Sequence, residues 1–238
     1  ILNTSVLLPP KSKTRIPVAC VEEGRWSHVS PTFKAGNYAP SSLRQRKSRD
    51  VARSLQTRGR AESDQGAVWN SVAEHIASSK AAAPTRAMSD AMGALDKVLD
   101  RYREALPYPP GACGVVAAVC GRFVAVDAFD APATLEAIWR RLVASYAVDA
   151  EADREGKDKS LSVKAVEMLL GHVGEQEAQD FDAVGLGRDL RLEAAALFGQ
   201  GLHVGSRLVH LSVFPPTPMA RSLRHRGRRI SPPSGRCR

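Results

Sequence analysis

Three segments of the chain carry apolar residues at the spacing of an amphipathic helix. In the first of them, Val68, Val72 and Ile76 recur at every fourth residue. Side chains three or four positions apart share one helix face, so each segment is predicted to pack that face against a core. The third segment follows Asp130 and has Pro132 as its first residue, which is typical of a helix start with Asp130 as the N-cap. The predicted helices are Gln65–Ser79, Asp90–Leu106 and Pro132–Ala150.

Two further helices are predicted from weaker patterns. Leu43–Leu55 is rich in basic residues and has only a narrow apolar stripe. Leu161–Leu170 is a short apolar run that follows the acidic stretch Glu151–Lys159. Between the first predicted strands and these helices, Ser30–Ser42 is rich in Pro, Gly and Ser, which is typical of a loop.

The β-type runs of the sequence come in pairs that favour hairpins. Leu2–Leu8 and Arg15–Glu23 are separated by a loop that starts with two prolines, which cannot donate to a strand ladder. Cys113–Ala128 is predicted to turn at Gly121-Arg122. A last hairpin is predicted from Leu190–Phe198 and Leu202–Phe214, with its turn at Gly199-Gln200-Gly201.

These elements predict an α+β fold, in which an antiparallel or mixed sheet built from hairpins has several amphipathic helices packed against it. No strand leads through a glycine-rich turn into a long helix, so a doubly wound nucleotide-binding fold is not predicted. With 238 residues, we expect one α+β domain over residues 1–216 and a disordered, Arg-rich tail over 217–238. The chain begins at Ile1 inside a predicted strand, which suggests a fragment that lacks its natural N-terminus.

The formal net charge of +9 is concentrated in two segments. Residues 44–60 contribute +6 and residues 219–238 contribute +7, which leaves −4 for the rest of the chain. Loose Arg-rich segments bind phosphate backbones weakly and without sequence preference. A solvated helix face and tail is the other interpretation, and it agrees with the usual behaviour of charge blocks.

The apolar runs and the cysteines indicate the cellular compartment. No apolar run approaches the ~18 residues that a membrane-spanning helix needs, so no membrane span is predicted. The four cysteines form no C-x-x-C pair and have no histidine at ligand spacing, so no metal site is predicted from them. Three of them lie in apolar runs, as buried free thiols do, and this favours a reducing cytoplasm.

The stretch IPVACVEEGRW places polar groups at the end of an apolar run. If it is a strand, Ile16, Val18, Cys20 and Glu22 share one face, so Glu22 continues an apolar row. A carboxylate there must be paired or have a raised pKa, and Arg25 is the nearest candidate partner. Glu22 is therefore either a structural ion-pair partner or part of a site.

Asp127 and His210 lie on similar apolar rows. Asp127 alternates with Phe123, Ala125 and Phe129, so its carboxylate is a candidate to project into a pocket. In the functional interpretation it and Glu22 act as acid and base or hold a divalent cation, but no sequence spacing shows that the two residues meet. His210 is a candidate acid or base, although a lone histidine on an apolar face is more often a satisfied core residue.

Two other motifs carry weaker signals. Gly185-Leu186-Gly187 resembles a phosphate-binding turn but enters a strand, so only backbone N–H groups beside Arg188 could face an anion there. The serines Ser5, Ser145 and Ser212 lack a nucleophile-elbow context, so a Ser–His hydrolase is not predicted.

Several segments together resemble the ARPP domain family, which is associated with ADP-ribosylglycohydrolase and rhodanese-phosphatase-type proteins. The segments are LNTSVLLP, IPVACVEEGRW, QGAVW, DAFDAP with LEAIWRRLVASYAVDA, and GLGRDLRLE with LVHLSVF, and they run from Leu2 to Phe214. A polar element that precedes this region in relatives is absent here, which agrees with a truncated N-terminus. The polar positions matched to the family are Asn3, Cys20, Glu22, Arg25, Trp26, Asp127, Asp130 and His210.

The resemblance implies a link to ADP-ribose or a related NAD-derived nucleotide, by association and not by chemistry. In such a site Arg25 would contact phosphate and Trp26 would stack on a base, with Asn3 and Arg188 as further ligand contacts and Glu22, Asp127 and His210 as catalytic groups. The alternatives are a non-catalytic domain that docks on a partner enzyme, and weak nucleic-acid binding through the basic segment and tail. The sequence specifies no cofactor.

Overall fold

The computed structural model describes residues 1–23, 36–79, 86–153 and 159–215, and it has an α+β fold, as predicted. One six-stranded sheet has the order β1-β2-β6-β5-β4-β3, and every neighbouring pair is antiparallel. Its strands are β1 Gly114–Val119, β2 Arg122–Phe129, β3 Ala178–Asp182, β4 Arg188–Glu193, β5 Phe198–Val204 and β6 Arg207–Phe214.

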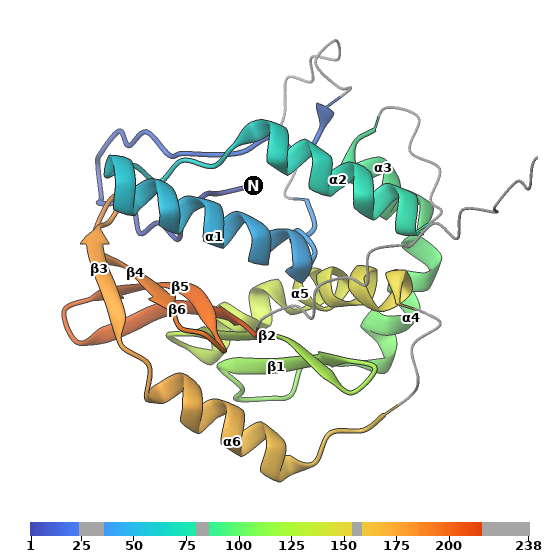
Figure 1. Ribbon diagram of the computed structural model, residues 1–238. Helices are drawn as coiled ribbons and strands as arrows, with labels where there is room; N and C mark the ends of the chain where they lie inside the picture. Colours follow the sequence, from blue (N-terminus) through green and yellow to red (C-terminus); the bar gives the residue numbers. More distant parts are fainter. Residues whose placement is uncertain (24–35, 80–85, 154–158, 216–238) are drawn as a thin grey trace, which may run out of the picture.

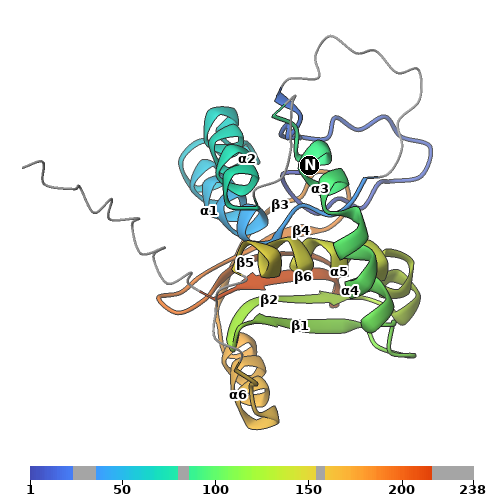
Figure 2. The ribbon, with the colours of Figure 1, turned by 90° about the vertical axis from the view of Figure 1, so that its right-hand side faces the viewer.

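Helices cover both faces of this sheet (Figures 1 and 2). Helix α1 packs on β5 and β2, and α5 packs on β1 and β2, so these two helices form the layer next to the sheet. Helices α2, α3 and α4 lie outside them, and α6 lies on the opposite face. The bounds are α1 Ser41–Arg58, α2 Gln65–Ser79, α3 Met88–Ala94, α4 Asp96–Ala105, α5 Pro132–Ala152 and α6 Val163–Gly174.

The helical periodicity located these helices well. Helix α2 has the predicted bounds, and the predicted helix Asp90–Leu106 is divided at Leu95 into α3 and α4. Asp130 accepts a hydrogen bond from the Thr134 hydroxyl at 2.9 Å and not from the α5 backbone, so its prediction as a side-chain N-cap is wrong. The apolar stripes of these helices meet in one core, which includes Leu43, Val72, Met92, Leu99, Ala144 and Val148.

The last predicted hairpin has its turn in a different place. Gly199 and Gly201 lie inside β5, and the chain turns between β5 and β6 at Gly205, where φ is +58°. A Cβ atom on Gly199 would overlap the carbonyl oxygen of Ser212 on the neighbouring strand. These glycines therefore mark a close approach of two strands and not a turn, because they have no side chain to separate the backbones.

The N-terminal runs do not form the predicted strands. They make isolated antiparallel bridges, Leu2 with Val18, Leu7 with Leu186 and Glu22 with Ala87. Val18 is 62% exposed while the neighbouring Ala19 is buried, so the predicted apolar row that ends at Glu22 does not face the core. Each bridge joins the segment to a different part of the chain, so the side chains do not alternate as in a regular strand. The predicted shared face of Ile16, Val18, Cys20 and Glu22 depends on that alternation.

Among the helices of the described ranges, none is both long enough and apolar enough to cross a membrane.

Candidate functional site

Four polar side chains form a row across the sheet, on the face that α1 covers. Asp127 of β2 lies opposite Ser212 of β6, Ser212 lies opposite Gln200 of β5, and Gln200 lies opposite Arg191 of β4. Residues directly opposite each other in an antiparallel sheet share a face, so the four side chains are neighbours. We call Asp127, Ser212, Gln200 and Arg191 the polar row.

Asp127 forms a buried ion pair with Arg44 of α1. The two guanidinium NH groups of Arg44 donate to the two carboxylate oxygens at 2.8 and 3.0 Å, and the hydroxyls of Tyr146 and Ser212 donate to the same carboxylate. Burial alone raises the pKa of Asp127, but the charge and hydrogen bonds of Arg44 outweigh burial and hold this pKa below its ordinary value. Asp127 is therefore an ionised, fully satisfied acceptor at neutral pH.

A second buried ion pair lies at the other end of the polar row. Arg191 donates to both oxygens of Asp189, at 2.7 and 2.9 Å, and to Gln200 Oε1 at 3.0 Å. The Thr4 hydroxyl also donates to Asp189. Lys47 of α1 is buried nearby, and burial together with the charge of Arg191 lowers the pKa of Lys47 to about 7. Helix α1 thus directs two basic side chains toward the sheet, the buried Lys47 and Arg44, whose side chain is 14% exposed.

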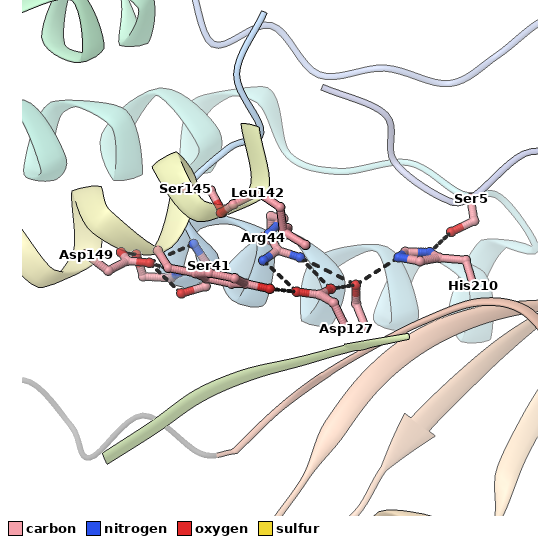
Figure 3. Close-up of polar contacts among 11 residues, drawn as sticks. Ser5, Ser41, Arg44, Asp127, Leu142, Ser145, Asp149 and His210 are labelled. Carbon is pink, nitrogen blue, oxygen red and sulfur yellow. Dashed lines mark hydrogen bonds and ion pairs between the residues drawn. The ribbon is translucent and has the colours of Figure 1, made fainter. Parts of the chain in front are cut away.

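His210 continues the hydrogen bonding from Asp127 toward the N-terminal segment (Figure 3). Its Nε2 lies 3.2 Å from the Ser212 hydroxyl, and its Nδ1 lies 2.6 Å from the Ser5 hydroxyl. The ring stacks on Phe129, with ring centroids 4.9 Å apart. Burial lowers the pKa of His210 to about 4, so the imidazole is neutral at pH 7. The structure therefore joins two of the predicted catalytic residues, Asp127 and His210, through Ser212.

Glu22, the third predicted catalytic residue, has a different set of partners. Its carboxylate accepts hydrogen bonds from the Ser89 backbone N–H at 3.1 Å and from the Ser89 hydroxyl at 2.5 Å. A carboxylate in this position satisfies a free N–H group in the first turn of α3 and complements the helix dipole. The hydrogen-bond partner of Glu22 thus lies on α3, whereas those of Asp127 lie on α1, α5 and β6. The catalytic pairing of Glu22 with Asp127 stays a prediction.

Of the four predicted ligand contacts, the structure describes two, Asn3 and Arg188. Arg25 and Trp26 lie outside the described residues, as does the tail 217–238. Asn3 is buried, donates to the Ala61 carbonyl at 3.0 Å and accepts from the Ser63 hydroxyl. Arg188 pairs with Asp182.

The turn before Arg188 does not offer its central N–H group to an anion. Leu186 N–H donates to the Leu7 carbonyl at 2.8 Å, so this backbone group is already satisfied. The expectation of an anion-binding turn at Gly185-Leu186-Gly187 is wrong for this N–H group. Gly185 has φ +108°, and a side chain there would overlap the Leu7 backbone, so the glycine serves the close approach of the N-terminal segment.

A cavity of about 680 Å³ opens beside Asn3. Its charged lining includes Arg15 and Arg60 as well as Glu62 and Asp182. Ile16, Val18 and Leu55 supply apolar wall. It thus combines cationic, hydrogen-bonding and apolar surface within one space.

A cluster at the start of α1 fixes this helix to its neighbours. Asp149 of α5 accepts hydrogen bonds from the Ser41 backbone N–H at 2.7 Å and from the hydroxyls of Ser41 and Ser42. His75 of α2 lies 2.7 Å from the Ser42 hydroxyl through Nε2, and its Nδ1 lies 2.8 Å from the Ser71 carbonyl oxygen. Asp149 therefore supplies the N-terminal cap that α1 lacks from its own residues.

Two basic side chains of α1 that lie beside the polar row, Arg44 and Lys47, were not predicted as site residues. Both interpretations of the basic segment 44–60, phosphate binding and a solvated face, place its side chains in solvent, yet Arg44 and Lys47 lie in the interior. Their spacing to the buried residues Val51 and Leu55 is that of one helix face, which is the signal that could have identified them. In the part of the chain that the structure describes, no three His, Cys, Asp or Glu side chains gather in a way that could hold a metal ion.

The fold and site define an α+β domain whose sheet carries a buried polar row beneath one helix. The chain belongs to the ARPP-1 family, the ARG and Rhodanese-Phosphatase-superfamily-associated Protein domain, which matches residues 1–214. No curated protein and no solved structure matches it.

Proposed function

We propose that this domain binds ADP-ribose or a related NAD-derived nucleotide in the cavity beside Asn3. The observation that carries the proposal is the cavity itself, because its volume of about 680 Å³ suits a small-molecule ligand of this size. The family is described by its association with ARG and rhodanese-phosphatase-superfamily proteins, which agrees with a ligand from this area of metabolism.

The lining of the cavity suits the three chemical parts of such a ligand. Arg15 and Arg60 are exposed guanidinium groups that can form paired hydrogen bonds with a diphosphate. The carboxylates of Glu62 and Asp182 can accept hydrogen bonds from ribose hydroxyls. The apolar wall at Leu55 can cover one face of the base.

Calorimetric titration of ADP-ribose and NAD into the full chain, with and without Mg²⁺, tests the proposal. We expect heat of binding with wild type and at least a tenfold weaker affinity for Arg15→Ala and Arg60→Ala. Arg101→Ala is the matched control, since Arg101 is an exposed arginine on α4 that does not line this cavity. The absence of binding heat with both ligands would overturn the proposal.

The second candidate function is a non-catalytic domain that docks on a partner enzyme. The saturation of Asp127 by Arg44, Tyr146 and Ser212 favours it, because this carboxylate then stabilises the fold instead of acting on a substrate. For Asp127→Asn this function predicts a lower melting temperature with turnover unchanged. Nucleotide affinity does not separate the two functions, because Asp127 does not line the cavity beside Asn3. A loss of turnover in a folded Asp127→Asn protein would instead support a catalytic role.

Nucleic-acid binding ranks third among the proposals. The interior positions of Arg44 and Lys47 reduce the charge that the basic segment can offer to a phosphate backbone. Binding through the remaining basic groups and the tail would weaken steeply with salt and would disappear on deletion of residues 219–238.

A further inference from the structure

The hydrogen bonds around His210 fix the direction in which each proton points. Asp127 is an ionised carboxylate and can only accept, so the Ser212 hydroxyl donates its single proton to Asp127. The Ser212 oxygen must then accept from His210 Nε2–H. Because the neutral imidazole has one N–H, Nδ1 carries the lone pair and accepts from the Ser5 hydroxyl.

This arrangement has the elements of an activated nucleophile. A hydroxyl lies within hydrogen-bond reach of a base, at 2.6 Å, and a third group orients that base from its other nitrogen. Here Ser212 and the buried Asp127 provide the orientation, and Phe129 holds the plane of the ring by stacking. Ser5 and His210 are half-buried, whereas Asp127 and Ser212 are fully buried. Of these four hydrogen-bonded residues, Ser5 and His210 are therefore the two that solvent can reach.

We propose that Ser5 is a nucleophile for acyl transfer from a carboxylic ester, with His210 as its general base and Ser212 and Asp127 as positioning residues. Ser5 Oγ bonds to the acyl carbon while its proton moves to His210 Nδ1. The protonated imidazole then returns this proton to the departing alkoxide, which leaves as the alcohol. Water, deprotonated by His210, then attacks the acyl carbon of the acyl-serine. The bond to Ser5 Oγ breaks, the Ser5 alkoxide takes the proton back from His210, and the carboxylic acid is released. The inference concerns residues other than the lining of the nucleotide cavity and does not require the nucleotide.

A fluorophosphonate probe, which phosphonylates activated serines with loss of fluoride, tests the inference on the full chain. We expect an adduct on Ser5, located by tandem mass spectrometry of the tryptic peptide that contains Ser5 and ends at Lys11. The adduct should be absent in Ser5→Ala and retained in Ser12→Ala, whose serine is exposed in the same segment. Hydrolysis of p-nitrophenyl acetate should likewise be present in wild type and in Ser12→Ala and absent in Ser5→Ala.

The roles of the other two side chains have separate readouts. His210→Gln should slow labelling of Ser5 at least tenfold. Ser212→Ala should change the pH dependence of the labelling rate, because His210 Nε2–H loses its acceptor and the tautomer is no longer fixed. Folding of each variant is checked by its melting curve.

A folded wild-type protein with no adduct on Ser5 would overturn the inference, and so would labelling of Ser5 that His210→Gln leaves unchanged. Neither result depends on ADP-ribose, because the probe and the ester contain no nucleotide. Failure of this inference is thereby distinguished from failure of the proposed nucleotide site.

Discussion

The carboxylate of Asp127 and the guanidinium of Arg44 face each other with two hydrogen bonds, although 83 residues separate them in the chain. This pair joins the first long helix to the second strand of the sheet. The guanidinium also lies near the rings of Tyr146 and Phe214, whose centroids are within 6 Å of it. The polar row is thus fixed to α1 at the point where α5 also packs.

The first prediction concerns the cost of breaking this pair. Arg44→Met leaves the Asp127 carboxylate buried without its counter-charge, so we expect a loss of about 3–5 kcal/mol in the free energy of unfolding. Arg46→Met is the matched control on the same helix, because Arg46 forms an exposed pair with Glu74 and should cost less than about 1 kcal/mol. Urea denaturation measures both variants. Equal losses for the two would contradict the buried-pair interpretation.

Local periodicity was enough to locate the helices and the first hairpin of the sheet. The residues of α2 and α5 repeat at helical spacing, and the hairpin of β1 and β2 follows from its apolar runs and its glycine turn. The break at Leu95 and the glycines inside β5 escaped prediction, because both depend on what packs against them from elsewhere in the chain.

The candidate site was predictable only in part, for a related reason. Strand alternation identified Asp127 and His210 as polar side chains on apolar rows, and the structure joins them. Their link through Ser212 depends on strand register, and the partners Arg44 and Ser5 depend on tertiary packing. Strand order and register are set by the whole sheet, so no local pattern could supply these contacts.

The second prediction uses the lowered pKa of Lys47, which is about 7 against an ordinary 10.5. Between these two pH values the unfolded chain holds a proton that the folded chain lacks, so stability rises with pH in this interval, by up to about 1.4 kcal/mol per pH unit. Lys47→Met removes the buried amine and should be more stable than wild type at pH 7. Denaturation at pH 7, 8 and 9 gives the difference between the two proteins, which should narrow as pH rises. A difference that stays constant over this range would show that Lys47 does not titrate as inferred.

The third prediction concerns His75 at the start of α1. Burial lowers the pKa of His75, but the hydrogen bond and charge of Asp149 outweigh burial and raise this pKa above 6.5. The stabilising contribution is therefore fully present below pH 6.5 and is lost as pH rises through the folded-state pKa. His75→Gln should lack this loss, whereas His172→Gln, at an exposed histidine of α6, should behave as wild type. Melting temperatures from pH 5.5 to 8.5 provide the test, and a wild-type profile for His75→Gln would refute it.

The fourth prediction tests whether the glycines of β5 are there for a close approach of strands. Gly199→Ala places a Cβ against the carbonyl oxygen of Ser212 and within 3.1 Å of the Val213 side chain, so β5 and β6 must separate. We expect a loss of about 1–3 kcal/mol, as for other overpacked sites. Gly171→Ala is the matched control, because a Cβ there meets nothing within 4 Å and alanine favours the helix, by about 0.5–1 kcal/mol. The two changes should thus move the urea midpoint in opposite directions. Because Ser212 belongs to the polar row, Gly199→Ala should also reduce the labelling of Ser5. If Gly199→Ala changes neither the urea midpoint nor the labelling of Ser5, the space between β5 and β6 admits a Cβ atom and the close-approach interpretation is wrong.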